Sequence, residues 1–402
     1  MVLPLEGIRV LDLTQWVFGP TTAAVLGDWG AEVIHVEDPN GGDPMRGLQS
    51  MSVISMSDIN FPFELCNRNK KSLAVDINCE QGHRVLCGLI EKSDVFVSSL
   101  RKNVLERARL DYSTLSAINP RLIFAHVSGY GEEGPEQNRA GYDYAAFWAR
   151  TGLMASQGEP GTPPPPQRNG WGDQISGLSL AGGIALALFV RERTGIGQQV
   201  SLSLLGSGIW MGGCLVQGAL ATGEAFSQLS RKAAGNPLFN TYETSDGRWL
   251  QIISLQTDRY WPGFCKALER PDLEDDPRFD SHEKRCANNT VLISIIDEAL
   301  SNRTLTDWAN RFDENGVLWG PVQTYLEVAN DPQALANGYI TEVEHPVLGR
   351  AGMVASPIQL NKTPGSIRST APELGQHTEE ILLDSGYSWE DIGRLKDERV
   401  IL

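Results

Sequence analysis

The chain has 402 residues, of which 41% are hydrophobic and 21% are charged, so it can form two domains with a sizeable core. Its net charge of −16 at pH 7 argues against nonspecific nucleic-acid binding, because that binding depends on neutralising phosphates with Lys and Arg. Residues 1–6 lack the basic stretch of a signal peptide, and the most apolar run, 182–190, is shorter than the roughly 18 residues that span a bilayer. We therefore expect a cytoplasmic protein with no nucleic acid and no membrane among its partners.

The six cysteines are scattered and form neither a C-x-x-C pair nor a Cys/His cluster with zinc spacing. They lie at positions 66, 79, 87, 214, 265 and 286. This pattern is typical of a reducing compartment and predicts no metal site.

The first 130 residues alternate between predicted strands and helices. Strands are predicted at 8–13, 32–36, 73–76, 94–97 and 122–127, with helices at 21–29 and 80–91. Strands separated by helical segments favour parallel pairing, and apolar strands are typical of a sheet buried on both faces. The sequence therefore predicts a large, doubly wound, Rossmann-like α/β domain. The segment 14–20 lacks the G-x-G-x-x-G motif, so this fold does not by itself indicate a dinucleotide site.

The rest of the chain changes character twice. Residues 155–172 are rich in Gly and Pro, which predicts a rigid connection before apolar helices that start near 173 and span 204–222. A hairpin with an Asp-Gly turn is predicted at 239–243 and 249–253, followed by helices at 257–269, 288–301 and 304–314. Short strands return after 340, before a helix at 373–383. We predict a large domain from 1–220 and 336–402, and a smaller α+β domain from 221–335.

Asp173 lies at the end of a glycine-rich turn, directly before an apolar helical stretch. Flanking glycines allow a ligand to approach the backbone closely, and a helix N-terminus stabilises negative charge. These features suit a nucleophilic carboxylate. They suit a simple helix N-cap equally well, since Asp is a preferred residue at that position.

A set of short motifs occurs in one order along nearly the whole chain. They are Gly7–Leu13, Gly19–Pro20, Gly30–Glu37, Asn67–Leu73, Asn119–Ile123, Ser128–Gly131, Gly141–Asp143, Arg193–Gln198 and Leu374–Thr378. In this order the chain resembles the family III CoA-transferases, the group that contains formyl-CoA transferase and carnitine CoA-transferase and that is related to α-methylacyl-CoA racemase.

The resemblance implies an interlocked homodimer whose large domain binds CoA and is built from both ends of the chain. Asp173 occupies the position of the family's catalytic aspartate. It would attack an acyl-CoA thioester to give a mixed anhydride and then an aspartyl-CoA thioester. An acceptor carboxylic acid would then receive CoA from this intermediate. The backbone N–H groups of Gly170 and Gly172 would stabilise the oxyanion. Acyl-CoA is then a substrate, and no tightly bound cofactor is expected.

Two other functions remain open on this resemblance. A related racemase carries a His as α-proton base where this chain has Tyr142, and a tyrosine that titrates near pH 10 is a poor base at neutral pH. His126 lies in a predicted buried strand, where we interpret it as a hydrogen-bonded core residue. The other alternative is a non-catalytic acyl-CoA-binding protein, which the presence of Asp173 disfavours.

CoA carries phosphates, so an acidic enzyme needs local cations. Candidates are Arg68 and Lys71 in one segment and Arg101 and Lys102 in another. By resemblance only Arg101 matches a CoA-binding position, and Lys102 is a weaker candidate beside it. His35 stands where the family often has Lys or Arg, and its ring is predicted to stack on adenine.

Two features indicate which acyl group is bound. Val17 replaces a glutamine of formyl-CoA transferase, and no tetraglycine loop occurs between 212 and 236, which disfavours formyl-CoA and oxalate. Aromatic residues surround the predicted site, namely Trp16, Phe18, Phe147, Trp148 and Trp171. They favour a larger, less polar acyl group if they line the site, and otherwise they belong to the core.

Overall fold

The computed structural model describes residues 2–51, 59–168, 170–226 and 228–402. The chain forms two compact units. The large unit comprises Met1–Leu153, Pro166–Thr222 and Pro332–Leu402, and the small unit comprises Met154–Pro165 and Gly223–Asp331. The sequence predicts limits at 220 and 335 and assigns 154–165 to the large domain. That last assignment is wrong, because the Gly/Pro-rich segment packs with the small unit.

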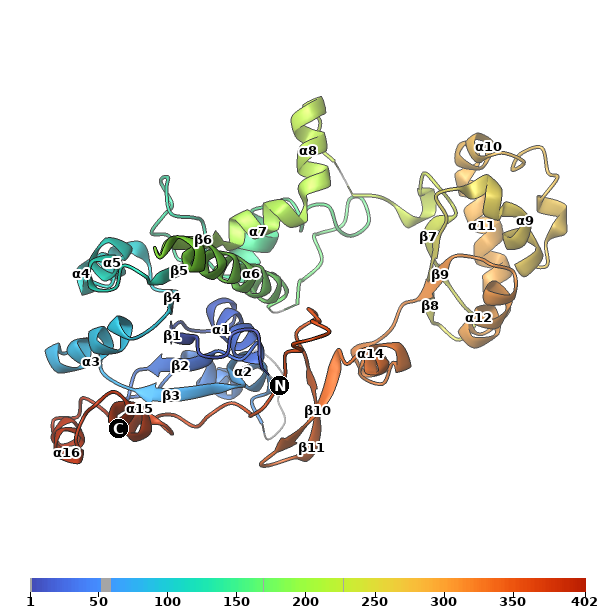
Figure 1. Cartoon of the computed structure of the whole chain (residues 1–402). Coiled ribbons are helices and arrows are strands. Elements are labelled where there is room, and N and C mark those ends of the chain that lie inside the picture. The colour runs from blue at the N-terminus through green and yellow to red at the C-terminus, as the bar shows by residue number, and fades with distance from the viewer. Residues whose placement is uncertain (1, 52–58, 169, 227) are drawn as a thin grey trace. The chain divides into compact units, whose positions relative to one another are not determined.

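The large unit is built on a six-stranded parallel sheet in the order β3-β2-β1-β4-β5-β6 (Figure 1). Its strands are β1 (Arg9–Leu13), β2 (Glu32–Glu37), β3 (Lys70–Ala74), β4 (Val95–Ser98), β5 (Ile123–Ser128) and β6 (Gln199–Ser203). The predicted α/β class with parallel strands is confirmed. Strand β6 was not among the predicted strands, although its alternation of polar and apolar residues is itself a strand pattern.

Helices join these strands and cover the sheet. They are α1 (Phe18–Asp28), α2 (Phe61–Asn67), α3 (Glu80–Glu91), α4 (Lys102–Ala108), α5 (Tyr112–Ile118), α6 (Trp171–Thr194), α7 (Leu204–Met211), α8 (Gly213–Thr222), α14 (Pro332–Ala336), α15 (Thr378–Asp384) and α16 (Trp389–Asp397). A 3-10 segment, Pro44–Met51, and a π-helical segment, Asp143–Ala149, complete the unit with the antiparallel pair β10 (Ile340–His345) and β11 (Gly349–Val354).

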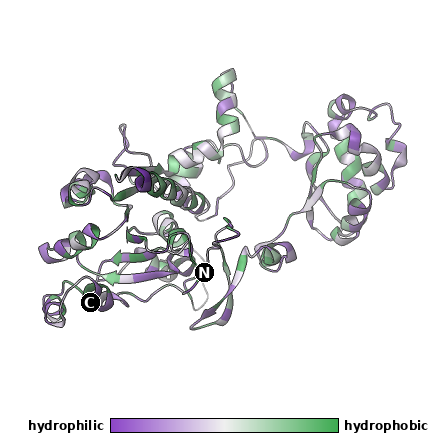
Figure 2. Cartoon of the chain, in the orientation of Figure 1, coloured by the Kyte–Doolittle hydropathy of each residue, from purple (hydrophilic) through white to green (hydrophobic). Residues whose placement is uncertain are grey.

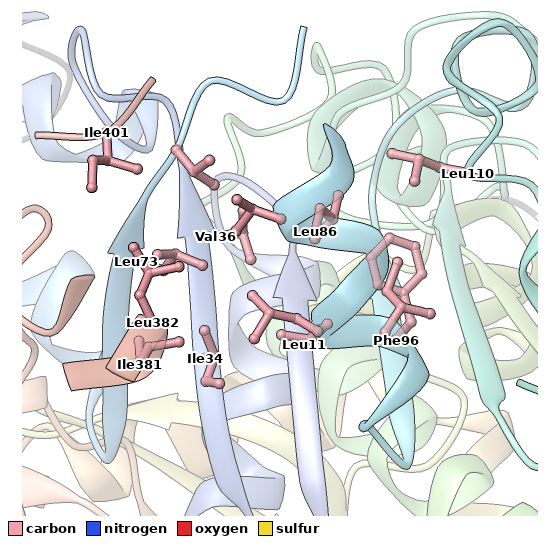
Figure 3. Close-up of a cluster of buried hydrophobic side chains, with 14 of the residues drawn as sticks. Leu11, Ile34, Val36, Leu73, Leu86, Phe96, Leu110, Ile381, Leu382 and Ile401 are labelled. Atoms are coloured by element: carbon pink, nitrogen blue, oxygen red, sulfur yellow. The ribbon is translucent and has the colours of Figure 1, made fainter. Parts of the chain in front are cut away.

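One face of the sheet packs against α3 and the returning C-terminal segment. Figure 3 shows this cluster, in which Leu11, Ile34 and Leu73 from three strands meet Leu86 of α3 and Leu382 of α15. Because side chains alternate across a strand, the neighbouring residues point to the opposite face. There α1 packs closely on α6, and a Cβ at Gly177 would lie 2.7 Å from Thr21. Both ends of the chain therefore contribute to one core.

The small unit has its own core around a three-stranded antiparallel sheet in the order β7-β8-β9. The strands are β7 (Phe239–Glu243), β8 (Trp249–Ile253) and β9 (Trp319–Pro321). The helices are α9 (Thr257–Ala267), α10 (His282–Ala287), α11 (Asn289–Leu300), α12 (Leu305–Glu314) and α13 (Tyr325–Ala329). The predicted hairpin is confirmed, with Phe239 opposite Ile253.

Two predicted helices are wrong in extent. The helix predicted at 204–222 breaks at Gly212, and α7 and α8 are bent by 76°. The helix predicted at 373–383 begins at Thr378, because Gly375 has a φ of +70° that interrupts a right-handed helix.

By length and composition α6 could cross a membrane, contrary to the sequence prediction that no segment is long enough. The helix α6 contains the apolar run 182–190 together with further apolar residues before it, so the helix is longer than that run. The bent pair α7 and α8 passes the same test if it is counted as one span. A buried core helix passes it too, and 39% of the most apolar window of α6 is buried.

Candidate active site

A pocket of about 310 Å³ lies in the large unit at the carboxyl ends of β1, β4 and β5. The strand order reverses at this point, since β1 is flanked by β2 on one side and by β4 on the other. Ligands of open α/β sheets bind at such switch points. Four predicted site residues line the pocket, namely Val17, Arg101, Tyr142 and Asp173.

Asp173 is the third residue of α6, and the helix is preceded by Gly170 with a φ of +75°. The alternative that Asp173 is the N-cap is therefore wrong. Its side chain is half-buried, and no described residue donates a hydrogen bond to its carboxylate oxygens. Burial and then the nearby charge of Asp143 raise the pKa of Asp173 to about 7.

Asp143 supplies the cap of α6 from the preceding segment. This buried carboxylate accepts a hydrogen bond from the Gly170 N–H at 3.1 Å. Burial raises the pKa of Asp143, and the N–H groups of Gly170, Gly172 and Asp173 partly oppose that rise. Its Oδ1 atom has no hydrogen-bond partner at good geometry among the described residues. Asp143 was missed because its effect depends on a contact across 27 positions of the sequence.

The two predicted oxyanion glycines have a different role from the one expected. The Gly170 N–H is occupied by Asp143, so the prediction that it stabilises an oxyanion is wrong. A Cβ at Gly172 would lie 2.2 Å from Oδ1 of Asp143 and 2.3 Å from the ring of Phe147. Glycine is therefore required at 172 so that Asp143 can approach the first turn of α6.

Tyr142 and His126 have clearly different surroundings in the pocket. Tyr142 is 59% exposed and makes an edge contact with Trp16, at 6.2 Å between ring centroids. His126 is buried, its Nδ1 faces Glu132, and its Nε2 lies 2.7 Å from the carbonyl oxygen of Leu100. The prediction that His126 is a hydrogen-bonded core residue is confirmed.

The aromatic residues divide into two groups. Trp16 and Phe18 line the pocket. Phe147 and Trp148 are buried in contact with each other, Trp171 is half exposed beside Trp148, and none of these three lines the pocket. The second group therefore belongs to the core and its edge.

Of the predicted CoA-binding cations, Arg101 is exposed at the pocket directly before α4. Its side chain makes no hydrogen bond or ion pair with another described residue. Lys102, the first residue of α4, lies outside the pocket lining, with its Nζ atom 3.4 Å from the carbonyl oxygen of Glu132. Arg101 is thus the cation best placed to meet a phosphate.

The structure contradicts the CoA-binding roles predicted for His35, Arg68 and Lys71, none of which lines the pocket. His35 is 0% exposed and cannot stack on adenine. Arg68 is buried, and its Nη2 atom lies 2.7 Å from Asp28. Lys71 forms ion pairs with Glu32 and Glu380, at 3.0 and 2.8 Å. These cations already have carboxylate partners.

His35 belongs to a buried group of charges that we call the strand-end cluster. Its members are Asp12, His35, Glu37, Asp43, Arg46 and Lys70. Asp12 of β1 and His35 of β2 are neighbours in register, and both lie on the sheet face opposite Leu11 and Ile34. The Asp12 carboxylate lies 3.0 Å from Nδ1 of His35 and 2.8 Å from Nζ of Lys70.

The cluster strongly perturbs its acids. Burial alone would raise the pKa of Asp12, but Lys70 and His35 hold it well below its usual range. Burial likewise opposes ionisation of Glu37, and Arg46 and His35 lower its pKa to about 2. In the sequence these residues are scattered polar positions between 12 and 70, and no local pattern marks them as neighbours.

The fold and the pocket together define an α/β enzyme. At the switch point of its sheet lies the Asp173 carboxylate, with which no described residue pairs. A family model described as CoA-transferase family III matches residues 5–378. The chain belongs to this family, and the predicted resemblance is confirmed.

Relatives and a solved structure agree with this assignment. The chain is 33% identical to the (R)-2-hydroxy-4-methylpentanoate CoA-transferase of Clostridioides difficile over 99% of both proteins. It is 33% identical to the succinyl-CoA--D-citramalate CoA-transferase of Chloroflexus aurantiacus over 99% of this chain and 98% of that protein. The crystal structure of a CaiB/BaiF family protein from Brucella suis matches with a TM-score of 0.85 and 28% identity, covering 96% of this chain and all of that one. The protein is a CoA-transferase that acts on CoA esters and carboxylic acids.

Proposed function

We propose that Asp173 is the covalent nucleophile of this CoA-transferase. An oxygen of its ionised carboxylate attacks the thioester carbonyl, the C–S bond breaks, and CoA leaves as a thiolate, which gives a mixed anhydride. The thiolate attacks the Asp173 carbonyl and releases the donor acid, which leaves an aspartyl-CoA thioester. The acceptor carboxylate attacks that thioester and releases CoA thiolate, which gives a second mixed anhydride. The thiolate then attacks the acceptor's acyl carbonyl, which forms the new CoA ester and releases the Asp173 carboxylate. Each step exchanges one activated acyl group for another.

One observation carries this proposal: Asp173 is the carboxylate that lines the pocket, and no described residue pairs with it. A pKa of about 7 leaves a substantial ionised fraction at neutral pH. The same raised pKa makes the carboxylate a better nucleophile than an ordinary aspartate, since nucleophilicity increases with basicity. Asp143 contributes to that rise and fixes the first turn of α6.

The surroundings of His126 favour transfer over racemisation. An α-proton base needs a free nitrogen that can reach the substrate. Both ring nitrogens of His126 face oxygen acceptors, Glu132 and the carbonyl of Leu100. Tyr142 occupies the position of the racemase histidine. Incubation of an acyl-CoA with an acceptor carboxylic acid in D2O is expected to give CoA transfer without deuterium at the α-carbon.

We also propose an interlocked homodimer in the cytoplasm. Apolar side chains are exposed on α6, α7 and α8, among them Leu186, Phe189, Trp210 and Leu220, and Trp210 is 88% exposed. Hydrophobic residues recur along α7 and α8 in Figure 2. A second copy of the chain would cover such a surface. The six cysteines, all described, form no disulfide, which fits a reducing compartment.

The proposal is tested with Asp173→Ala and the isosteric Asp173→Asn. Both variants are expected to lose at least about 10³-fold in turnover, because the covalent route is removed. Titration calorimetry with free CoA serves as the control and is expected to give wild-type affinity. Near-normal turnover in either variant would show that Asp173 is not the nucleophile.

A further inference from the structure

Trp16 has an unusual backbone conformation at the edge of the pocket. Its φ is +70°, in the left-handed region that side chains other than glycine rarely adopt. It follows β1 and lines the same pocket as Asp173. A bulky aromatic residue in this conformation is held there by its surroundings, and such positions concentrate at functional sites.

Asp43 is the group that holds it. Its Oδ1 atom accepts hydrogen bonds from the backbone N–H groups of Trp16 at 3.1 Å and Met45 at 2.9 Å. Asp43 is itself fixed in the strand-end cluster, where its N–H donates to Glu37 at 3.0 Å. The strand-end cluster is therefore connected directly to the pocket wall through the hydrogen bond from Trp16 to Asp43.

The indole of Trp16 has a packed side and a side toward the pocket. On one side it packs against the small cluster that contains Met45 and Phe63. It also meets Tyr142 edge to face, with an angle of 84° between the rings. Trp16 and Tyr142 together form an aromatic edge of the pocket that Asp173 also lines.

Of the four Arg, His and Asp side chains among the described lining residues, namely Arg101, His126, Arg139 and Asp173, two have protein partners. Arg139 pairs with Glu136, and His126 pairs with Glu132. Among the described lining residues this leaves Arg101 as the cation without such a partner, and CoA itself brings phosphates to this pocket. A second substrate carboxylate beside Trp16 would be desolvated without a cation, whereas an apolar group would bury surface against the indole.

We propose that Trp16, held by Asp43, is the specificity-determining residue of the acyl pocket and selects acids with an apolar side chain over dicarboxylic acids. This inference rests on the proposed transfer function. Asp43 acts through Trp16 and is therefore a positioning residue. The substrate class is branched aliphatic or aromatic monocarboxylic acids and their CoA esters.

The test compares 4-methylpentanoate with succinate as acceptors. They share the reacting end and differ only in a terminal isopropyl or carboxylate group of similar shape. With one CoA-ester donor, the wild-type enzyme is expected to favour 4-methylpentanoate by about 100-fold in kcat/KM. Preference for succinate would overturn the proposal. Failure to transfer CoA to any acid would instead contradict the proposed function.

Trp16→Gly removes the indole and is compatible with a positive φ, so the backbone can keep its conformation. This variant is expected to reduce the preference to below about 10-fold, mainly through a higher KM for 4-methylpentanoate, while affinity for free CoA stays unchanged. Trp16→Ala is the matched control for backbone strain. It should lose the preference to the same extent as Trp16→Gly, but its thermal stability should be lower than that of Trp16→Gly, because alanine disfavours a positive φ. An unchanged preference in a folded Trp16→Gly enzyme would overturn the proposal.

Asp43 is tested with a matched pair of variants. Asp43→Asn keeps an acceptor oxygen for the Trp16 N–H and is expected to retain the wild-type preference within about threefold. Asp43→Ala removes that acceptor and should reproduce the lost preference of Trp16→Gly. If both variants keep the preference when circular dichroism shows them folded, Asp43 does not position Trp16.

Discussion

The large unit buries carboxylates in two places, and the pKa of the carboxyl group is shifted in opposite directions in the two. In the strand-end cluster Asp12 lies between His35 and Lys70, and its pKa stays well below its usual range despite burial. At the first turn of α6, Asp173 lies near another acid, no cation of the described part of the chain pairs with it, and its pKa rises to about 7. Both acids belong to one folded unit, and the difference lies in the charges around them.

This contrast separates a structural acid from a reactive one. A buried charge that is paired and hydrogen-bonded contributes to a unique fold. An unpaired buried charge lowers the stability of the folded state, and such charges concentrate at functional sites. The strand-end cluster is therefore a frame for the pocket wall, and the Asp143–Asp173 pair is the chemical site. Four predictions test this division, from the largest expected effect to the smallest.

Removal of Lys70 should affect stability most. Lys70→Met leaves Asp12 buried with His35 as its remaining cation, and loss of one partner of a buried ion pair typically costs about 3–5 kcal/mol. Chemical denaturation monitored by circular dichroism measures the loss. Arg84→Met, which removes an exposed i,i+4 pair with Glu80, is the control and should change stability by less than about 0.5 kcal/mol. Equal effects would show that the cluster has no special structural role.

Arg101 offers the opposite case, an unpaired cation at the pocket. Arg101→Glu should raise the KM for acyl-CoA by about 10- to 100-fold, because a phosphate contact is replaced by repulsion. The KM for the acceptor acid and the melting temperature should change little. A comparable rise in both KM values would argue against a role in CoA binding. Lys102→Glu provides a neighbouring charge reversal outside the pocket lining.

Asp143→Asn keeps the shape of the cap and removes its negative charge. With that charge gone, the pKa of Asp173 should fall, although burial, the larger cause of the rise, persists. The acid limb of kcat/KM for acyl-CoA should therefore shift to lower pH, and turnover at the plateau should drop by about tenfold as the nucleophile becomes less basic. An unchanged acid limb would show that Asp143 does not act on Asp173 electrostatically.

Asp173→Asn should stabilise the protein in a pH-dependent way. The folded-state pKa of about 7 lies above the ordinary value of 3.8, so ionisation of Asp173 disfavours the folded state. That cost is absent below pH 3.8, grows as the pH rises toward 7 and is constant above it. At pH 8 the variant should gain on the order of 1–2 kcal/mol, a figure reduced for the partial exposure of the side chain. Thermal melts should show a smaller gain at pH 5, and an equal gain at both pH values would contradict the raised pKa.

The sequence predicted what depends on local patterns. The parallel sheet follows from apolar runs such as 122–127, and Asp173 follows from ordered motifs that place it in the family. Long-range contacts escaped prediction. Asp143 caps a helix that begins 28 residues later, and His35, which was predicted to stack on adenine, is buried against Asp12, which also pairs with Lys70.

The failed CoA assignments have the same physical cause. Arg68 and Lys71 are cations in a family motif, and sequence alone does not show that Asp28 and Glu32 already neutralise them. Arg101 differs because it follows β4 at the switch point of the sheet, where the backbone brings ligand-binding residues together. The role of Arg101 in CoA binding stays a prediction.

The most direct test of the central claim is mass spectrometry of the enzyme after rapid quenching with its CoA ester. Trypsin releases residues 169–191 as one peptide, which contains Asp173 and no other acidic residue. We predict that this peptide gains the mass of CoA less one water during turnover, and that the gain is absent in Asp173→Asn. An unmodified peptide in an enzyme that is quenched during active transfer would contradict a covalent aspartyl intermediate.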